Sequence, residues 1–244
     1  MFKYIVLSIL FLFLASSEVC AQKNIENQQL LWLRYNLRLK LSDSYQITQE
    51  FDERNFVSPW RQHQFLARTR LERTFNNRWK AAVGLTIIEQ SLPANPEVKN
   101  YHNITELTPQ FEVYNKQALT NKLALEHRYW TDFRFFEQPD GSFEFNNLRA
   151  RYRLELQYNV VETVTLKVFD EIFLNVGSKI VNNVFDQNRV GGSVQYMPTK
   201  AMGLELGYFN SFQQRPTGVD FYNRNIFRFT IHHNVNFKKS KLHA

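Results

Sequence analysis

Strict alternation of apolar and polar side chains runs through most of the sequence and limits what the chain can fold into. Within 31–41 every odd position is apolar, whereas Arg34, Asn36, Arg38 and Lys40 occupy even positions. Successive side chains of an extended strand point to opposite faces, so this segment has one apolar face and one charged face. After position 21 no run approaches the roughly eighteen apolar residues of a transmembrane helix.

The same two-faced pattern returns at intervals of roughly twenty residues. Each run covers roughly ten to fourteen positions, which exceeds ordinary globular strands and is enough for a tilted strand to cross a bilayer. The predicted strands are 29–41, 45–54, 62–75, 79–90, 103–115, 122–135, 145–158, 163–175, 185–197, 202–213 and 223–237. The pattern predicts an all-β fold, an antiparallel up-and-down transmembrane β-barrel of about 10 to 12 strands.

The connections between these strands alternate between short and long, as in outer-membrane barrels with short periplasmic turns and longer outward loops. The short ones are 42–44, 76–78, 159–162 and 197–201, and the long ones are 91–102, 136–144, 176–184 and 214–222. Bacterial barrels normally have an even number of strands. We therefore expect twelve strands, with one missed near 98–110 or 176–184; the alternative is a ten-stranded barrel with the first segment partly in its lumen.

The first twenty-one residues predict export. Lys3 supplies a positive charge, Tyr4 to Ala15 form an apolar run, and Val19-Cys20-Ala21 ends in a small residue, as in a signal peptide. The apolar run would span only about 18 Å as a helix, too short for a membrane anchor. We expect a signal peptide at 1–21 and a single outer-membrane barrel domain at 22–244, which contains no cysteine for disulfides or thiolate metal sites.

The net charge of +7 could suggest a nucleic-acid partner. The basic residues are instead scattered at alternate strand positions and mixed with Glu and Asp, which favours a polar lining and predicts no nucleic-acid partner. The expected partners are outer-membrane lipid and the barrel-assembly machinery. Since the chain has no His-Glu-x-x-His, calcium-loop or glycine-rich phosphate motif, we expect no metal and no cofactor.

A secreted β-sandwich or lipocalin-like barrel would show the same alternation with its apolar face inward. Two observations favour the membrane barrel. Tyr152, Leu154 and Tyr158 share one face of a strand and resemble an interfacial aromatic band, and the opposite face, with Arg149 and Arg151 among its residues, is unusually charged for a water-facing surface.

If the apolar face meets lipid, the charged face lines a narrow lumen in which Arg and Glu must pair. The predicted lumen network is Glu50, Asp52, Arg54, Arg68, Arg70, Glu72, Glu112, Glu126, Arg128, Arg149, Arg151, Arg153, Glu155, Glu171, Arg189 and Arg228. Its first interpretation is structural, with ion pairs that fill the lumen and hold the strand register in a barrel of structural or surface-interaction role. The alternative is a narrow pore that prefers anionic solutes.

A lipid hydrolase of the outer membrane is a further alternative, which would need a Ser nucleophile beside a His base. His63, His127 and His233 fall on the lipid-facing parity and His232 on the lumen parity. No Gly-x-Ser-x-Gly motif occurs, and no Ser and His have a spacing that strand geometry would bring together. We therefore expect no enzymatic activity and no catalytic residues.

Several segments together resemble an uncharacterised family of gram-negative outer-membrane barrels, classified only as a domain of unknown function. They are Trp32, Glu50-Phe51-Asp52-Glu53-Arg54, Arg68-Thr69-Arg70-Leu71-Glu72-Arg73, Arg149-Ala150-Arg151-Tyr152-Arg153-Leu154-Glu155, Asp170-Glu171-Ile172-Phe173, Asn188-Arg189, Gly207-Tyr208 and a closing strand that ends at Phe237. The resemblance spans nearly the whole mature chain and implies an outer-membrane barrel without implying an activity. The basic tail 238–244 departs from barrels that end at the terminal aromatic residue.

Overall fold

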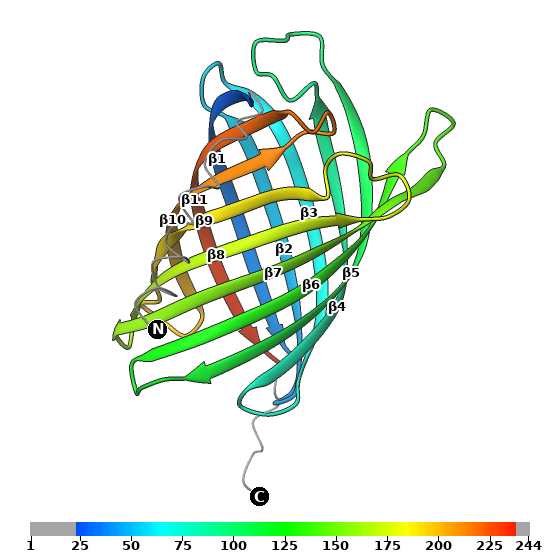
Figure 1. The fold of residues 1–244 in the computed structure, drawn as a ribbon. Coiled ribbons are helices and arrows are strands. Elements are labelled where there is room, and N and C mark those ends of the chain that lie inside the picture. The colour runs from blue at the N-terminus through cyan, green and yellow to red at the C-terminus, as the bar shows by residue number, and fades with distance from the viewer. Residues whose placement is uncertain (1–22, 238–244) are drawn as a thin grey trace, which may run out of the picture.

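Eleven strands form one closed barrel in the computed structural model, which describes residues 23–237 (Figure 1). The strands are β1 (Asn24–Lys40), β2 (Tyr45–Phe56), β3 (Arg61–Thr74), β4 (Trp79–Leu92), β5 (His102–Ala118), β6 (Leu123–Glu137), β7 (Phe143–Val161), β8 (Val164–Val176), β9 (Phe185–Tyr196), β10 (Met202–Gln214) and β11 (Asp220–Asn236). No helix in the described chain is long and apolar enough to cross a membrane. The predicted signal peptide and the basic tail lie outside the described residues.

All eleven predicted segments are strands, and the expectation of a twelfth is wrong. Segment 177–184 connects β8 to β9, and 93–101 connects β4 to β5, without a strand in either. With an odd number the first and last strands run in the same direction, so the barrel closes through parallel pairing of β1 with β11, from Asn24 beside Asp220 to Lys40 beside Asn236. Every other neighbouring pair is antiparallel.

The apolar face of the wall points outward and the charged face points inward. Phe111 is 47% exposed and Leu206 63% exposed on the outer surface, whereas Asp52 and Glu112 inside are fully buried. This is the reverse of a lipocalin-like barrel, whose apolar side chains fill the interior. The alternation that predicts the strands thus also separates the two surfaces of the wall.

The two ends of the barrel differ mainly through 93–101 and 177–184, which are nine and eight residues long, whereas the other connections have two to five residues. One end, the short-turn rim, carries 41–44, 75–78, 119–122, 162–163 and 197–201; the other, the long-loop rim, carries 57–60, 93–101, 138–142, 177–184 and 215–219. Gly141 and Gly218 adopt φ of 80° and 82° at the long-loop rim, a conformation that favours glycine. Because β1 and β11 are parallel, β1 begins at the long-loop rim and β11 ends at the short-turn rim.

Changing Gly191→Ala is expected to destabilise the barrel by about 3 kcal/mol through overpacking. Gly191 pairs with Phe209 across β9 and β10, and a Cβ there would lie 2.3 Å from the Tyr208 carbonyl oxygen and 2.3 Å from the Phe209 Cβ. At Gly207 the nearest atom to an added Cβ lies at 3.4 Å, an ordinary contact, so Gly207→Ala is the control. Urea unfolding in detergent micelles compares the two variants, and equal stabilities would contradict the argument.

Candidate functional site: the arginine-rich lumen

The barrel interior contains a cavity of about 570 Å³ whose lining reaches from Arg224 and Gln213 near the long-loop rim to Arg38 and Lys80 near the short-turn rim. Fifteen basic and seven acidic side chains line it, and four more carboxylates, Asp52, Glu112, Asp132 and Asp186, are buried against these basic groups. The basic residues are Arg34, Arg38, Arg54, Arg68, Arg70, Lys80, Arg128, Arg134, Arg149, Arg151, Arg153, Lys167, Arg189, Arg224 and Arg228, and the acidic ones are Glu50, Glu72, Glu106, Glu126, Glu155, Glu171 and Glu205.

One ion-pair cluster joins the first three strands. Arg34 of β1 donates to Asp52 of β2 at 2.7 Å, and Arg54 donates to the same carboxylate at 2.9 Å. Arg68 of β3 donates to Glu50 at 2.9 Å. The alternation places Glu50 and Asp52 on one face of β2. The register aligns Glu50 with Arg68 of β3 and Asp52 with Arg34 of β1, so each acid meets a guanidinium from a neighbouring strand.

A second cluster surrounds Glu171 of β8, which is 2% exposed. Arg128 of β6 and Arg151 of β7 both approach its carboxylate to 2.8 Å, and Arg153 lies 3.7 Å away. Guanidinium groups offer several donors to one carboxylate, and the contacts link three consecutive strands. Such buried ion pairs cost desolvation energy, so their main contribution is a fixed geometry, whereas removal of one partner is strongly destabilising.

Smaller groups of ion pairs complete the lining near the short-turn rim. Glu205 of β10 accepts from Arg228 and Lys167, both at 2.8 Å, and lies 3.3 Å from His232. Lys80 reaches Glu72 at 2.7 Å. These contacts bring further carboxylates of the lumen into contact with cations of neighbouring strands.

Two tryptophans inside the lumen lie against arginines. The Arg151 guanidinium lies 3.5 Å from the ring centre of Trp130, and that of Arg54 lies 3.8 Å from the ring centre of Trp32. Both indoles are 3% exposed. Stacking on an aromatic face stabilises a desolvated guanidinium, so these rings hold charged side chains in place.

Most members of the predicted lumen network lie in contact with one another. Arg70 links the first cluster to β5, since it lies 3.9 Å from Glu50 and 3.6 Å from Glu112. Two members form no ion pair within 4.0 Å in the described structure: Glu126 and Arg189 line the cavity, and Arg189 donates only to Gln187. Their side chains are therefore available to the lumen.

Some lumen residues were absent from the predicted network although the alternation of β6 carries them. Asp132 pairs with Arg149 at 2.9 Å, and Arg134 donates to Glu106 at 2.6 Å. Asp132 and Arg134 share the parity of Arg128, so the alternation alone was sufficient to assign both residues to the lumen. Trp32 and Trp130 share the inward parity as well, but as apolar residues they gave no reason to place them in a charged lumen.

The assignment of His63 to the lipid-facing side is wrong. The β2–β3 pairing shifts between Arg54 and Asn55, where Asn55 pairs with Gln62 and Arg54 with Gln64. This β-bulge reverses the alternation for the first residues of β3. His63 is consequently 6% exposed and lines the cavity.

The described lumen contains no hydrogen-bonded Ser and His. Ser211 donates to Gln187, His232 lies beside Glu205, and His127 and His233 are hydrogen-bonded to tyrosine hydroxyls. Among residues 23–237 no group of three or more His, Cys, Asp or Glu could hold a metal ion. The described lumen therefore presents mainly ion pairs and fixed charges.

Comparison with known proteins agrees with this architecture. The solved structure titled "NanC porin structure in rhombohedral crystal form" shares the fold with a TM-score of 0.52 and 12% sequence identity, over 84% of this chain and 97% of that one. No curated protein matches the chain in sequence. Residues 29–223 match the family described as "Protein of unknown function (DUF2490)", and the chain therefore belongs to the DUF2490 family.

Proposed function

We propose that the protein is a non-enzymatic barrel of the outer membrane that gives small anions a narrow path through its lumen. The observation that carries the proposal is a cavity whose lining reaches both rims and whose basic side chains outnumber the carboxylates, fifteen to eleven when the four buried carboxylates that pair with them are counted. Charged side chains lining a pore select for ions of opposite sign. A lumen sealed only for stability would need balanced charges and no continuous cavity.

The outer surface supports the location. Apolar side chains such as Val168 and Phe227, 56% and 57% exposed, cover the wall where lipid would contact it. Exposed apolar area of this extent is unfavourable in water and suits hydrocarbon. In this proposal lipid surrounds the wall, the assembly machinery inserts it, and the long-loop rim faces outward.

Current through single barrels in planar bilayers tests the proposal. Under a KCl gradient the reversal potential is expected to show preference for chloride. Arg38→Glu changes the charge by two units and is expected to reduce the anion-to-cation permeability ratio by at least about fivefold, since a single charge at 4 Å in water already contributes about 1 kcal/mol. Arg38 lines the cavity near the short-turn rim without an ion pair within 4.0 Å, so its substitution leaves no carboxylate unpaired.

Lys122→Glu is the matched control, because Lys122 is an exposed turn residue at the same rim and does not line the cavity. It carries the same change of charge and should leave the ratio within the error of the measurement. Silent bilayers, or a preference for potassium in the unmodified protein, would overturn the proposal.

A further inference from the structure

Two arginines in the half of the lumen toward the long-loop rim have no carboxylate partner. Arg189 donates to Gln187 at 3.1 Å, and Arg224 donates to Gln28 at 2.8 Å and to Gln213 at 2.6 Å. Within 23–237 neither has a carboxylate oxygen within 4.0 Å. Neutral amides do not compensate a positive charge, so both guanidiniums are buried without a direct ion pair in the described structure.

These charges lie in the same cavity as one buried histidine. Arg54, Arg189, Arg224 and His63 all line it, and the guanidiniums of Arg54 and Arg189 lie 3.8 Å and 5.3 Å from the ring centre of Trp32. The Nδ1 atom of His63 is buried without a hydrogen-bond partner in the described structure. Asp52 pairs with Arg54 at 2.9 Å. Two carboxylates close to the other arginines, Glu171 opposite Arg189 and Asp186 near Arg224, form no ion pair with them within 4.0 Å in the described structure. A gathering of like charges is unfavourable unless an anion lies among them.

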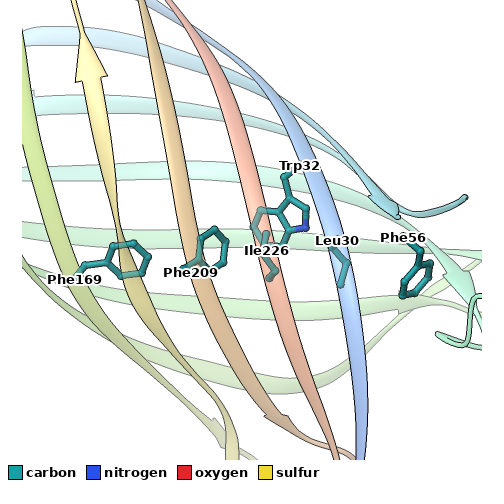
Figure 2. Close-up of a cluster of buried hydrophobic side chains, with 6 residues drawn as sticks. All are labelled: Leu30, Trp32, Phe56, Phe169, Phe209 and Ile226. Atoms are coloured by element: carbon teal, nitrogen blue, oxygen red, sulfur yellow. The ribbon is translucent and has the colours of Figure 1, made fainter. Parts of the chain in front are cut away.

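An apolar wall lies beside this group inside the lumen. Figure 2 shows its six side chains, which come from strands on both sides of the parallel β1–β11 pair. They are Leu30, Trp32, Phe56, Phe169, Phe209 and Ile226. The Arg189 guanidinium lies 5.3 Å from the ring centre of Trp32, and the His63 ring lies 4.8 Å from that of Phe56. The Trp32 indole nitrogen is buried without a hydrogen-bond partner in the described chain.

Fixed cations beside an apolar wall are complementary to a solute with an anionic end and an apolar body. We propose that Arg189, Arg224 and His63 bind the carboxylate of a small organic acid whose ring or chain packs on the wall around Trp32. The proposal rests on the proposed function in that the solute reaches this site through the lumen. It adds that one site along the lumen binds small organic acids more tightly than inorganic anions.

Equilibrium dialysis of the purified full-length barrel in detergent micelles against radiolabelled benzoate tests this site. Binding is expected to saturate at one benzoate per barrel, with unlabelled acetate and inorganic phosphate competing at least about tenfold more weakly, because neither can bury a ring. Binding that does not saturate, or acetate or phosphate that competes as well as benzoate, would overturn the site.

Arg189→Gln is expected to raise the benzoate dissociation constant by about tenfold, as loss of a charge-assisted hydrogen bond does. The variant should fold, because Glu171 nearby keeps Arg128 and Arg151 as partners. Arg38→Gln is the matched control, since Arg38 is also unpaired in the lumen but lies near the opposite rim; it should change the constant less than twofold. An unchanged Arg189→Gln constant, or equal losses in both variants, would overturn the assignment.

The two proposals fail separately. Chloride preference without saturable benzoate binding would support the anion path and contradict the organic-acid site. If the barrel carries no current but binds benzoate saturably, and Arg189→Gln abolishes that binding, the site is supported and the anion path is contradicted.

Discussion

Replacing Glu171→Gln is expected to lower the free energy of unfolding by about 3–5 kcal/mol, the range for breaking a buried ion pair by removing one partner. The carboxylate holds Arg128 and Arg151 at 2.8 Å each and Arg153 at 3.7 Å. The neutral amide has nearly the same shape but leaves three guanidiniums facing one another. The loss is therefore electrostatic and leaves packing almost unchanged.

Urea unfolding in lipid vesicles, followed by the gel-mobility difference between folded and unfolded barrel, measures this loss. Glu144→Gln is the control, because Glu144 pairs with Lys179 while both side chains are about half exposed. That exposed pair should contribute less than about 1 kcal/mol. If both variants lose similar stability, Glu171 does not neutralise the cluster.

An epitope tag inserted directly before Asn24 is expected to be accessible on the surface of intact gram-negative cells. The parallel pairing with β11 fixes the start of β1 at the long-loop rim, which faces outward in the proposed orientation. An antiparallel barrel with an even number of strands would place the same residue in the periplasm. Because the outer membrane blocks antibodies, the expected difference is between full labelling and none.

Antibody labelling before and after permeabilisation of the cells makes the measurement. A tag within 177–184 at the long-loop rim should be labelled on intact cells, and a tag within 197–201 at the short-turn rim only after permeabilisation. If the tag before Asn24 behaves like the one within 197–201, the parallel closure is contradicted.

The strands could be predicted from the sequence because a period of two is a local property. Arg68 within 62–75 and Arg151 within 145–158, for example, fall on the charged parity of their segments, and both point inward. Which strands pair at the closure is not local. The expectation of an even number rested on other barrels, and nothing in β1 or β11 alone signals that they run parallel.

The site could be predicted only where the alternation is unbroken. His63 lies after a bulge that reverses the parity, and a bulge depends on how β2 pairs with β3. Trp32 is an apolar residue on the charged parity of β1. Its inward position is explained by its contacts with the Phe209 ring and the Arg54 guanidinium, which lie on other strands. Which arginines lack partners depends on the register between strands, so Arg189 could be assigned to the lumen but not recognised as unpaired.

The apolar wall of the lumen has a consequence for how ions would cross. Leu30 of β1 and Ile226 of β11 face the lumen, and their neighbours Leu31 and Phe227 face outward. The barrel is therefore apolar on both faces at this strand pair. A hydrated ion loses solvation free energy when it approaches a region of low dielectric constant, so it avoids this strand pair. Its route would lie off the barrel axis, away from β1 and β11 and toward the arginines of β6, and the open cross-section would be narrower than the circumference of the barrel suggests.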